Sequence, residues 1–400
     1  MPDTRRLPEG FLWGASTAAH QIEGGNTNSD WWEFEHSQNP IVKEPSGDAC
    51  DSYHRWREDM DLLAELGFTD YRFSIEWARI EPSPGEFSRS AIAHYRRMVE
   101  GARERGLRPM VTLHHFTNPL WFAQRGGWAA AGSDELFARF LTAAAPIYAT
   151  DVAHVCTINE PNIVTVMAAA QTALASGQAV SFTENPPAPD EATTDALVRA
   201  HARAVETVKS LAPHVHTGWS IANLVCQPLP GSEDVADSFR HPRQDVFIEA
   251  ARGDDWLGVQ AYTRTLIGPQ GRLPVPQDAE RTLMGWEYYP QALGHALRHS
   301  ASVSGGTPLI VTENGIATAD DARRIDYTTG ALDSLATTMR EGIDVRGYFH
   351  WSALDNYEWG RYAPTFGLIA VDRETFARAP KPSAAWLGAI GRTRVLPTEY

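Results

Sequence analysis

The sequence predicts an α/β fold, a single (β/α)8 TIM barrel that takes up residues 1–400. Eight apolar, β-branched runs of strand length recur along the chain, and amphipathic stretches lie between most of them. Strands that alternate with helices form a parallel sheet, and eight strands are the number that closes a barrel. No linker rich in Pro, Gly or Ser divides the chain, so we expect one domain.

Each strand prediction rests on a short run rich in Val, Ile, Phe, Tyr, Trp or Thr, which suit a pleated and buried surface. In chain order the runs are 11–17, 70–75, 108–115, 154–160, 215–223, 256–262, 308–314 and 346–353.

Amphipathic stretches predict the helices between these strands. They cover 59–66, 92–105, 135–149, 194–211 and 328–341, and 163–177 is interpreted as the helix after the fourth strand. That stretch contains Thr and Gln and is too short to span a bilayer. The Pro-rich segments 185–189 and 268–277 are predicted to be surface loops.

Composition narrows the classes of function. Apolar residues make up 43% and charged residues 21% of the chain, as in an ordinary soluble globular protein. The net charge of −15 and the scattered Lys and Arg argue against nucleic acid or a membrane as partner. Three isolated cysteines (Cys50, Cys156, Cys226) fit a reduced compartment, and no signal-peptide stretch precedes the first strand. We expect a cytoplasmic protein without cofactor or metal, whose oligomeric state stays open.

Two glutamates stand at the ends of predicted strands. Glu160 ends the fourth and is followed by Pro161, and Glu313 lies near the end of the seventh, before Gly315. The carboxyl ends of barrel strands share one mouth, so both side chains should meet there. Either glutamate alone could form a structural ion pair, but two carboxylates at one mouth are the minimal equipment for cleaving a glycosidic bond.

An ordered series of motifs covers nearly the whole chain and resembles glycoside hydrolase family 1, the retaining β-glycosidases of clan A. The motifs are FLWGASTAAHQIEGG (11–25), YRFSIEWARI (71–80), VTLHHFTNP (111–119), TINEPN (157–162), DWLGVQAYT (255–263), GWEYYP (285–290), VTENG (311–315), HWSALDNYEW (350–359), FGLIAVD (366–372) and PKPSA (380–384). The resemblance implies a small-molecule β-glycoside as substrate.

The resemblance also assigns catalytic roles. Glu160 corresponds to the general acid/base, which needs a raised pKa, and Glu313 to the nucleophile, which must stay ionised. Arg72 and Tyr262 match the groups that keep the nucleophile ionised, although alone they could be a core ion pair and a packed aromatic. Asn159 matches the residue that holds the sugar 2-hydroxyl.

Five residues match the family's pocket for the terminal sugar. They are the amide of Gln21, the imidazole of His115, the carboxylate of Glu358 and the indoles of Trp351 and Trp359. Trp286 is the candidate for stacking on the leaving group. A strand histidine is usually a core residue, and we expect that role for His114, which points to the opposite face.

The chain departs from the family pattern in three places. Phe116 stands where Trp is frequent, Gln260 where Asn is frequent, and Arg373 where Tyr is common. The extra methylene of Gln260 should shift its contact near the nucleophile. His214 and His216 have same-face spacing, but they lie at the amino end of the fifth strand, so we reject a metal site there.

The expected activity is that of an exo-acting, retaining β-glycosidase for β-glucosides, with β-galactosides or β-fucosides as further substrates. A 6-phospho-β-glycosidase is disfavoured because Glu358 would repel phosphate. A transglycosylase or natural-product deglycosylase with the same residues stays open, and a catalytically inactive sugar-binding barrel is the rival class.

Two backbone irregularities are expected at the mouth. Asn159 and Glu160 are consecutive, yet both should face the sugar, which requires a bulge or twist at that strand end. The resemblance also implies a cis peptide bond between Trp351 and Ser352.

Overall fold

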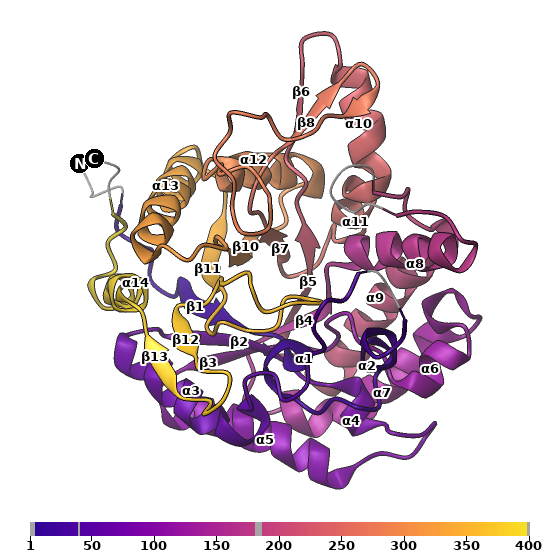
Figure 1. Cartoon of the computed structure of the whole chain (residues 1–400). Coiled ribbons are helices and arrows are strands. Elements are labelled where there is room, and N and C mark those ends of the chain that lie inside the picture. The colour runs from indigo at the N-terminus through magenta and orange to yellow at the C-terminus, as the bar shows by residue number, and fades with distance from the viewer. Residues whose placement is uncertain (1–4, 39–40, 181–185, 398–400) are drawn as a thin grey trace.

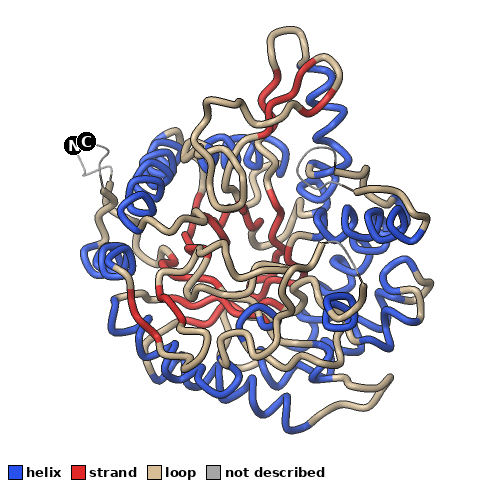
Figure 2. The backbone as a smooth tube through the Cα atoms, viewed as in Figure 1, coloured by secondary structure: helices blue, strands red, loops and turns tan. Residues whose placement is uncertain are grey.

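The computed structural model describes residues 5–38, 41–180 and 186–397, and its centre is a closed barrel of eight parallel strands. All eight predicted runs fall on barrel strands, so the predicted fold class is confirmed, and helices surround the strands (Figure 2). In chain order the barrel strands are β1 (Leu12–Ser16), β2 (Asp70–Ser74), β3 (Arg108–Thr112), β4 (His154–Asn159), β5 (His216–Ala222), β7 (Leu257–Gln260), β10 (Leu309–Asn314) and β11 (Val345–Trp351). Neighbours in this series pair with each other, and β11 pairs with β1 to close the barrel.

The helices have the following bounds, and Figure 1 labels the α-helices among them. They are α1 (Ala19–Ile22), α2 (Asp30–Glu35), α3 (Ser52–Leu66), α4 (Trp77–Ile80), α5 (Arg89–Glu104), α6 (Leu120–Gln124), η1 (Gly127–Ala129), α7 (Ser133–Tyr148), α8 (Pro161–Ala175), α9 (Glu191–Leu211), α10 (Glu233–Arg240), η2 (His241–Arg243), α11 (Asp245–Ala250), α12 (Ala292–Ser304), α13 (Asp321–Arg340) and α14 (Pro382–Thr393).

The predicted helices are confirmed, but each begins earlier than predicted. Polar capping residues explain several of the early starts, because a side-chain oxygen bonds the free backbone N–H groups of the first turn. Ser88 accepts from Ala91 N, Asp190 from Thr193 N, and Asp320 from Ala322 N. The apolar periodicity that predicted the helices carries no signal for these capped first turns.

Within the described ranges, five short strands lie outside the barrel. β6 (Cys226–Pro228), β8 (Thr265–Gly268) and β9 (Gly271–Arg272) form one sheet, and β12 (Ile369–Val371) pairs with β13 (Arg378–Pro380). The loop predicted for 268–277 was therefore wrong at its beginning, where β8 turns into β9. Residues 186–189 of the other predicted loop have no helix or strand, and residue 185 lies outside the described residues.

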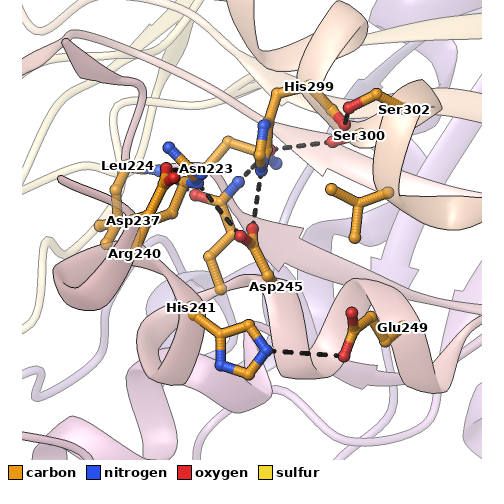
Figure 3. A network of polar contacts seen from close by, with 12 residues as sticks. Asn223, Leu224, Asp237, Arg240, His241, Asp245, Glu249, His299, Ser300 and Ser302 are labelled. Carbon is orange, nitrogen blue, oxygen red and sulfur yellow. Dashed lines mark hydrogen bonds and ion pairs between the residues drawn. The ribbon is translucent and has the colours of Figure 1, made fainter. Parts of the chain in front are cut away.

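A polar network joins the end of β5 to α10, α11 and α12 (Figure 3). Asp245 accepts hydrogen bonds from Arg240 Nε at 3.1 Å and His299 Nε2 at 2.7 Å. Next to it, Asn223 Oδ1 accepts from Gln244 Nε2 at 3.2 Å and Ser300 Oγ at 3.0 Å. These contacts fix the backbone that leaves the barrel after β5.

The first and last described segments lie side by side. The Leu7 N–H donates to Arg394 O at 2.8 Å, and Leu396 N–H donates to Arg5 O at 2.9 Å. α14 then packs on β1, since Trp13 Nε1 donates to Leu387 O at 3.0 Å. Residues from both ends of the sequence therefore support the same part of the barrel wall.

Among the described helices, none combines the length and apolar character needed to cross a membrane. Within the same residues, no group of three or more His, Cys, Asp or Glu side chains is arranged to hold a metal ion. His216 begins β5, and its ring stacks on that of His154 with centroids 5.3 Å apart.

Candidate active site

The end of β4 has the irregular geometry that the sequence required. The pairing register between β4 and β5 shifts between Cys156 and Asn159, and Glu160 adopts a φ of 44° in the left-handed region. Non-glycine residues rarely adopt this conformation. The expected irregularity at this strand end is confirmed. The expected cis peptide bond at Trp351–Ser352 is also present.

Glu313, near the end of β10, receives a hydrogen bond on each carboxyl oxygen. Arg72 Nη1 lies 2.6 Å from Oε1, and the Tyr262 hydroxyl lies 2.6 Å from Oε2. Burial raises the pKa of Glu313, while the Arg72 charge and the hydrogen bonds from Tyr262, Arg72 and Gln260 lower it. Burial also raises the pKa of Tyr262 well above its usual value, so its phenol stays protonated and can donate.

Glu160 lies in the opposite electrostatic situation. Its carboxyl group has no hydrogen-bond donor among the described residues, and burial together with the charge of Glu313 raises its pKa well above the usual value. Glu358 raises the pKa further, and only Arg72 lowers it. When two buried carboxyl groups interact, the one with more donors ionises first. Glu313, with its two donors, is therefore the group of the pair that ionises first.

Asn159 connects the two sides of the mouth. Its Oδ1 accepts hydrogen bonds from Arg72 Nη2 at 2.5 Å and from Gln260 Nε2 at 2.9 Å, which identifies Nδ2 as the donor end. That Nδ2 lies 3.3 Å from His115 Nε2, so Nε2 accepts and Nδ1 carries the imidazole hydrogen. Burial, then the Arg72 charge, lowers the pKa of His115 well below its usual value. His115 is thus a neutral ring, and its buried Nδ1 has no partner among the described residues.

Glu358 is held by three side chains of the predicted sugar pocket or its border. Its Oε1 accepts from Trp351 Nε1 at 3.2 Å and Asn356 Nδ2 at 3.0 Å, and its Oε2 lies 3.4 Å from Gln21 Nε2. Burial raises the pKa of Glu358 to about 8. Gln21 Nε2 also donates to Tyr357 O at 2.7 Å, while Gln21 Oε1 is buried without a partner among the described residues.

Aromatic rings complete the pocket wall. The His115 ring is nearly parallel to Trp351 and Trp359, with centroids 6.1 and 6.3 Å away. Trp286 lies beside Tyr262, with ring centroids 5.7 Å apart. The predicted site residues therefore lie at one end of the barrel and in contact with one another, with Glu160 connected through charge alone.

The departures from the family pattern have distinct outcomes. Gln260 reaches Asn159, so its contact with Glu313 works partly through that amide. Phe116 packs edge-on against Trp359, with centroids 5.0 Å apart. Arg373 donates to Ala49 O and stacks over Tyr362, and among the described residues these contacts do not link it to the site. His114 bonds Asn118 Oδ1 at 3.0 Å on the face away from the sugar pocket, as expected.

Sequence reasoning missed several supporting residues. Asn356 donates to Glu358, and His20 and Trp31 pack around Trp359. Asn356 and His20 stand one or two positions from residues that were identified. Their position in the same motifs as the identified residues was the signal that could have found them. No such signal pointed to Trp31.

A cavity of about 340 Å³ lies beside α8, the helix that Glu160 begins. Aromatic rings and polar groups from α2, η1, α8 and the segment after β3 line it, and Phe116 belongs both to this lining and to the surroundings of Trp359. Asp30, at its edge, has a pKa that burial raises to about 6.

Comparisons with known proteins agree with this geometry. The family model described as glycosyl hydrolase family 1 matches residues 3–251 and 274–395. A bifunctional β-D-glucosidase/β-D-fucosidase of Bifidobacterium breve is 31% identical over 96% of this chain and 97% of its own length.

Solved structures are similar over almost the whole chain. The β-glycosidase BGL167 has a TM-score of 0.89 at 44% identity and covers 98% of this chain and 99% of its own. A β-glucosidase of Thermotoga maritima in complex with deoxynojirimycin has a TM-score of 0.89 at 28% identity, covering 98% of this chain and 100% of its own. The two matched stretches of the family model include both Glu160 and Glu313. The chain therefore belongs to glycosyl hydrolase family 1 and is a glycoside hydrolase.

Proposed function

We propose that the protein is an exo-acting, retaining β-glycosidase that removes terminal β-D-glucosyl residues, with β-galactosyl or β-fucosyl residues as further substrates. One observation supports it above the others: Glu313 holds two hydrogen bonds from Arg72 and Tyr262, whereas Glu160 has none among the described residues and a strongly raised pKa. A double displacement needs this difference between its two carboxyl groups. The relatives named as β-glucosidases add support for the substrate class.

In the first step Glu313 attacks the anomeric carbon as the bond to the leaving oxygen breaks. Glu160 gives its proton to that oxygen, so the aglycone leaves as a neutral alcohol and a glycosyl ester forms on Glu313. In the second step Glu160, now a carboxylate, takes a proton from water while the water oxygen displaces Glu313. Two inversions give a product with the starting β configuration.

The neighbouring groups assist both steps. Before the first step the hydrogen bonds from Arg72 and Tyr262 keep Glu313 ionised as the nucleophile, and in the second step they stabilise the carboxylate as it is released. Asn159, with its carbonyl oxygen fixed by Arg72 and Gln260, presents its amide hydrogens toward a sugar hydroxyl. A contact to the 2-hydroxyl strengthens in the oxocarbenium-like transition state.

The other polar groups suit the remaining hydroxyls of an unphosphorylated sugar. Gln21 Oε1 is a free acceptor and His115 Nδ1 a free donor, each with no partner among the described residues. Glu358 offers carboxyl oxygens and opposes a phosphate. Trp351 and Trp359 offer indole faces to the ring, and Trp286 lies at a place suited to the leaving group.

The stereochemistry of the first product tests the proposal. Proton NMR during hydrolysis of an aryl β-glucoside should show the β-anomer first, and initial α-anomer would contradict retention.

Glu160→Ala should slow substrates with poor leaving groups most, while azide restores turnover of activated aryl glycosides by attacking the glycosyl–enzyme. Glu313→Ala should abolish both. The same spectra reveal glycosyl transfer to an added alcohol, and no turnover of any aryl β-glycoside would favour an inactive sugar-binding barrel.

Substrate preference gives a second test. Because we assign Glu358 to the sugar 6-hydroxyl, Glu358→Ser should lower kcat/KM for β-glucosides and β-galactosides by about 10- to 100-fold, the effect of leaving a buried hydrogen-bonding group without its partner. β-Fucosides lack the 6-hydroxyl and should lose far less. Steady-state kinetics with the three aryl glycosides compares them, and equal losses would remove Glu358 from this contact.

A further inference from the structure

Besides His115, three rings pack against the indole of Trp359. The backbone of Trp359 has a φ of 46°, a conformation that non-glycine residues adopt only when their surroundings impose it. Trp31 and Phe116 meet the indole edge-on, at 86° and 90° and centroid distances of 5.1 and 5.0 Å. His20 lies parallel to it, at 5° and 5.7 Å. Edge contacts limit sliding of the indole in its plane, whereas the parallel ring of His20 limits its tilt.

His20 is itself fixed by a carboxylate. Its Nε2 lies 3.5 Å from Glu35 Oε2, both side chains are fully buried, and neither atom has another partner among the described residues. On the other ring edge, His20 Nδ1 lies 3.1 Å from Asn26 Nδ2. The second oxygen of Glu35 accepts from Ser46 Oγ at 2.5 Å. Rotation of the imidazole plane would therefore break the contact with Asn26 and move Nε2 away from the buried carboxyl group of Glu35.

Gln21 and His20 are adjacent in α1, and they contact two adjacent residues after β11, Glu358 and Trp359. Gln21 bonds Glu358 and accepts the Tyr357 N–H on its backbone oxygen, while His20 supports Trp359. A shift of α1 would therefore move both the carboxyl group and the indole that we assign to the terminal sugar. Glu35 lies one contact further from the pocket, behind His20.

We propose that His20 and Glu35 are positioning residues that hold the Trp359 indole at the tilt at which it supports the terminal sugar. This inference rests on the proposed function, because Trp359 must touch the sugar for its tilt to matter. The pair sets how tightly the sugar is held through the transition state without contacting it.

A double-mutant cycle tests the proposal, with kcat/KM for an aryl β-glucoside as the readout. In the parent chain, His20→Ala should lower kcat/KM by about three- to tenfold, the size expected for one aromatic contact. In the Trp359→Ala chain, the same change should alter kcat/KM by less than about twofold, since no indole remains to be tilted. Equal factors in both backgrounds would show that His20 acts elsewhere and would overturn the proposal.

Variants of Glu35 provide a second test that changes the core less. Glu35→Ala should reproduce the loss seen with His20→Ala, again only when Trp359 is present. Glu35→Gln keeps an oxygen near His20 Nε2 and should restore at least half of the parent kcat/KM. Because Glu35→Gln removes no volume from the core, it remains informative if His20→Ala does not fold; a full loss with Glu35→Gln, or no loss with Glu35→Ala, would contradict the role of Glu35.

The chain contains a matched control. His201 is also buried, stacks on an indole (Trp219, 3.9 Å and 11°), and bonds a carboxylate, with its Nε2 2.9 Å from Asp254 Oδ2. His201→Ala should lower the melting temperature as His20→Ala does, yet leave KM unchanged. A parent chain that turns over no aryl β-glycoside would refute the proposed function, whereas an active parent with an additive cycle would refute only the positioning role.

Discussion

At the scale of single residues, the proton on Glu160 depends on the charge of Glu313. Burial and the negative charge of Glu313 raise the pKa of Glu160, so kcat/KM should fall as the pH rises through that pKa and the acid is lost. Glu313→Gln removes the second of these causes, and the pKa of Glu160 should then move down. Carbon-13 NMR of labelled glutamate side chains across a pH titration measures the shift, and an unchanged or higher pKa would disprove the coupling.

A variant of Tyr262 tests the opposite shift, a rise in the pKa of Glu313. Tyr262→Phe removes the 2.6 Å hydrogen bond to Glu313 Oε2, so the pKa of Glu313 should rise. The acid limb of the pH–rate profile should then move to higher pH, and kcat should fall by about 10- to 100-fold, as for a lost hydrogen bond to a charged group. Tyr148→Phe is the control, because among the described residues the Tyr148 hydroxyl bonds Leu141 O alone, and its pH profile should match the parent.

At the scale of elements, the sequence was informative where periodicity and turn residues carry the signal. All eight barrel strands and six helices follow from apolar runs, and the strand-end glutamates lie where those runs place them. α14 was missed because Gly388 and Gly391 weaken its helical pattern. The β8–β9 hairpin was missed because Pro and Gly around residue 270 resemble a plain loop.

Contacts through space were beyond the sequence for a different reason. The partner of Gln260 is Asn159, 101 residues away, and the support of Trp359 comes from His20, 339 positions earlier (359 − 20). Such pairs depend on how the barrel closes, and no local pattern records it. The family resemblance supplied roles for the predicted sugar-facing residues and for the partners of Glu313, and none for His20 or Trp31.

The glycines that weaken the pattern of α14 are required by its packing. A Cβ on Gly388 would overlap the backbone oxygen of Leu66, so Gly388→Ala must push α14 away from the end of α3. We expect a loss of about 1–3 kcal/mol in the free energy of unfolding, the usual range for overpacking. Urea denaturation measures it.

Gly294→Ala in α12 provides the comparison. Its added Cβ would meet Arg298 Nη1, the far end of a flexible side chain, and Ser334 Cβ, both at 3.0 Å. Alanine also favours the helix by about 1 kcal/mol over glycine, so this variant should be close to the parent in stability. Equal losses in the two variants would mean that the contact between α14 and α3 does not need glycine.

At the scale of the whole molecule, the barrel is closed by segments from both ends of the sequence. β1 pairs with β2 on one side and with β11 on the other, and α14 covers β1 from outside. The Leu7–Arg394 and Leu396–Arg5 backbone hydrogen bonds hold the flanking segments together. Closure therefore requires contacts between residues 335 positions apart, as between Leu12 and Gly347 (347 − 12), and such long-range contacts slow folding.

The pairing of residues 5–7 with 394–396 has a practical consequence. These segments precede β1 and follow α14, and Leu7 lies five positions before the amino end of a strand whose carboxyl end faces the active site. A chain anchored to a bead through either end would therefore present its mouth to the liquid, and kcat/KM for a small aryl glycoside should stay at the free-solution value. Anchoring through Leu283→Cys, at an exposed site near Trp286, in a Cys226→Ser background, should instead obstruct the entrance and lower it.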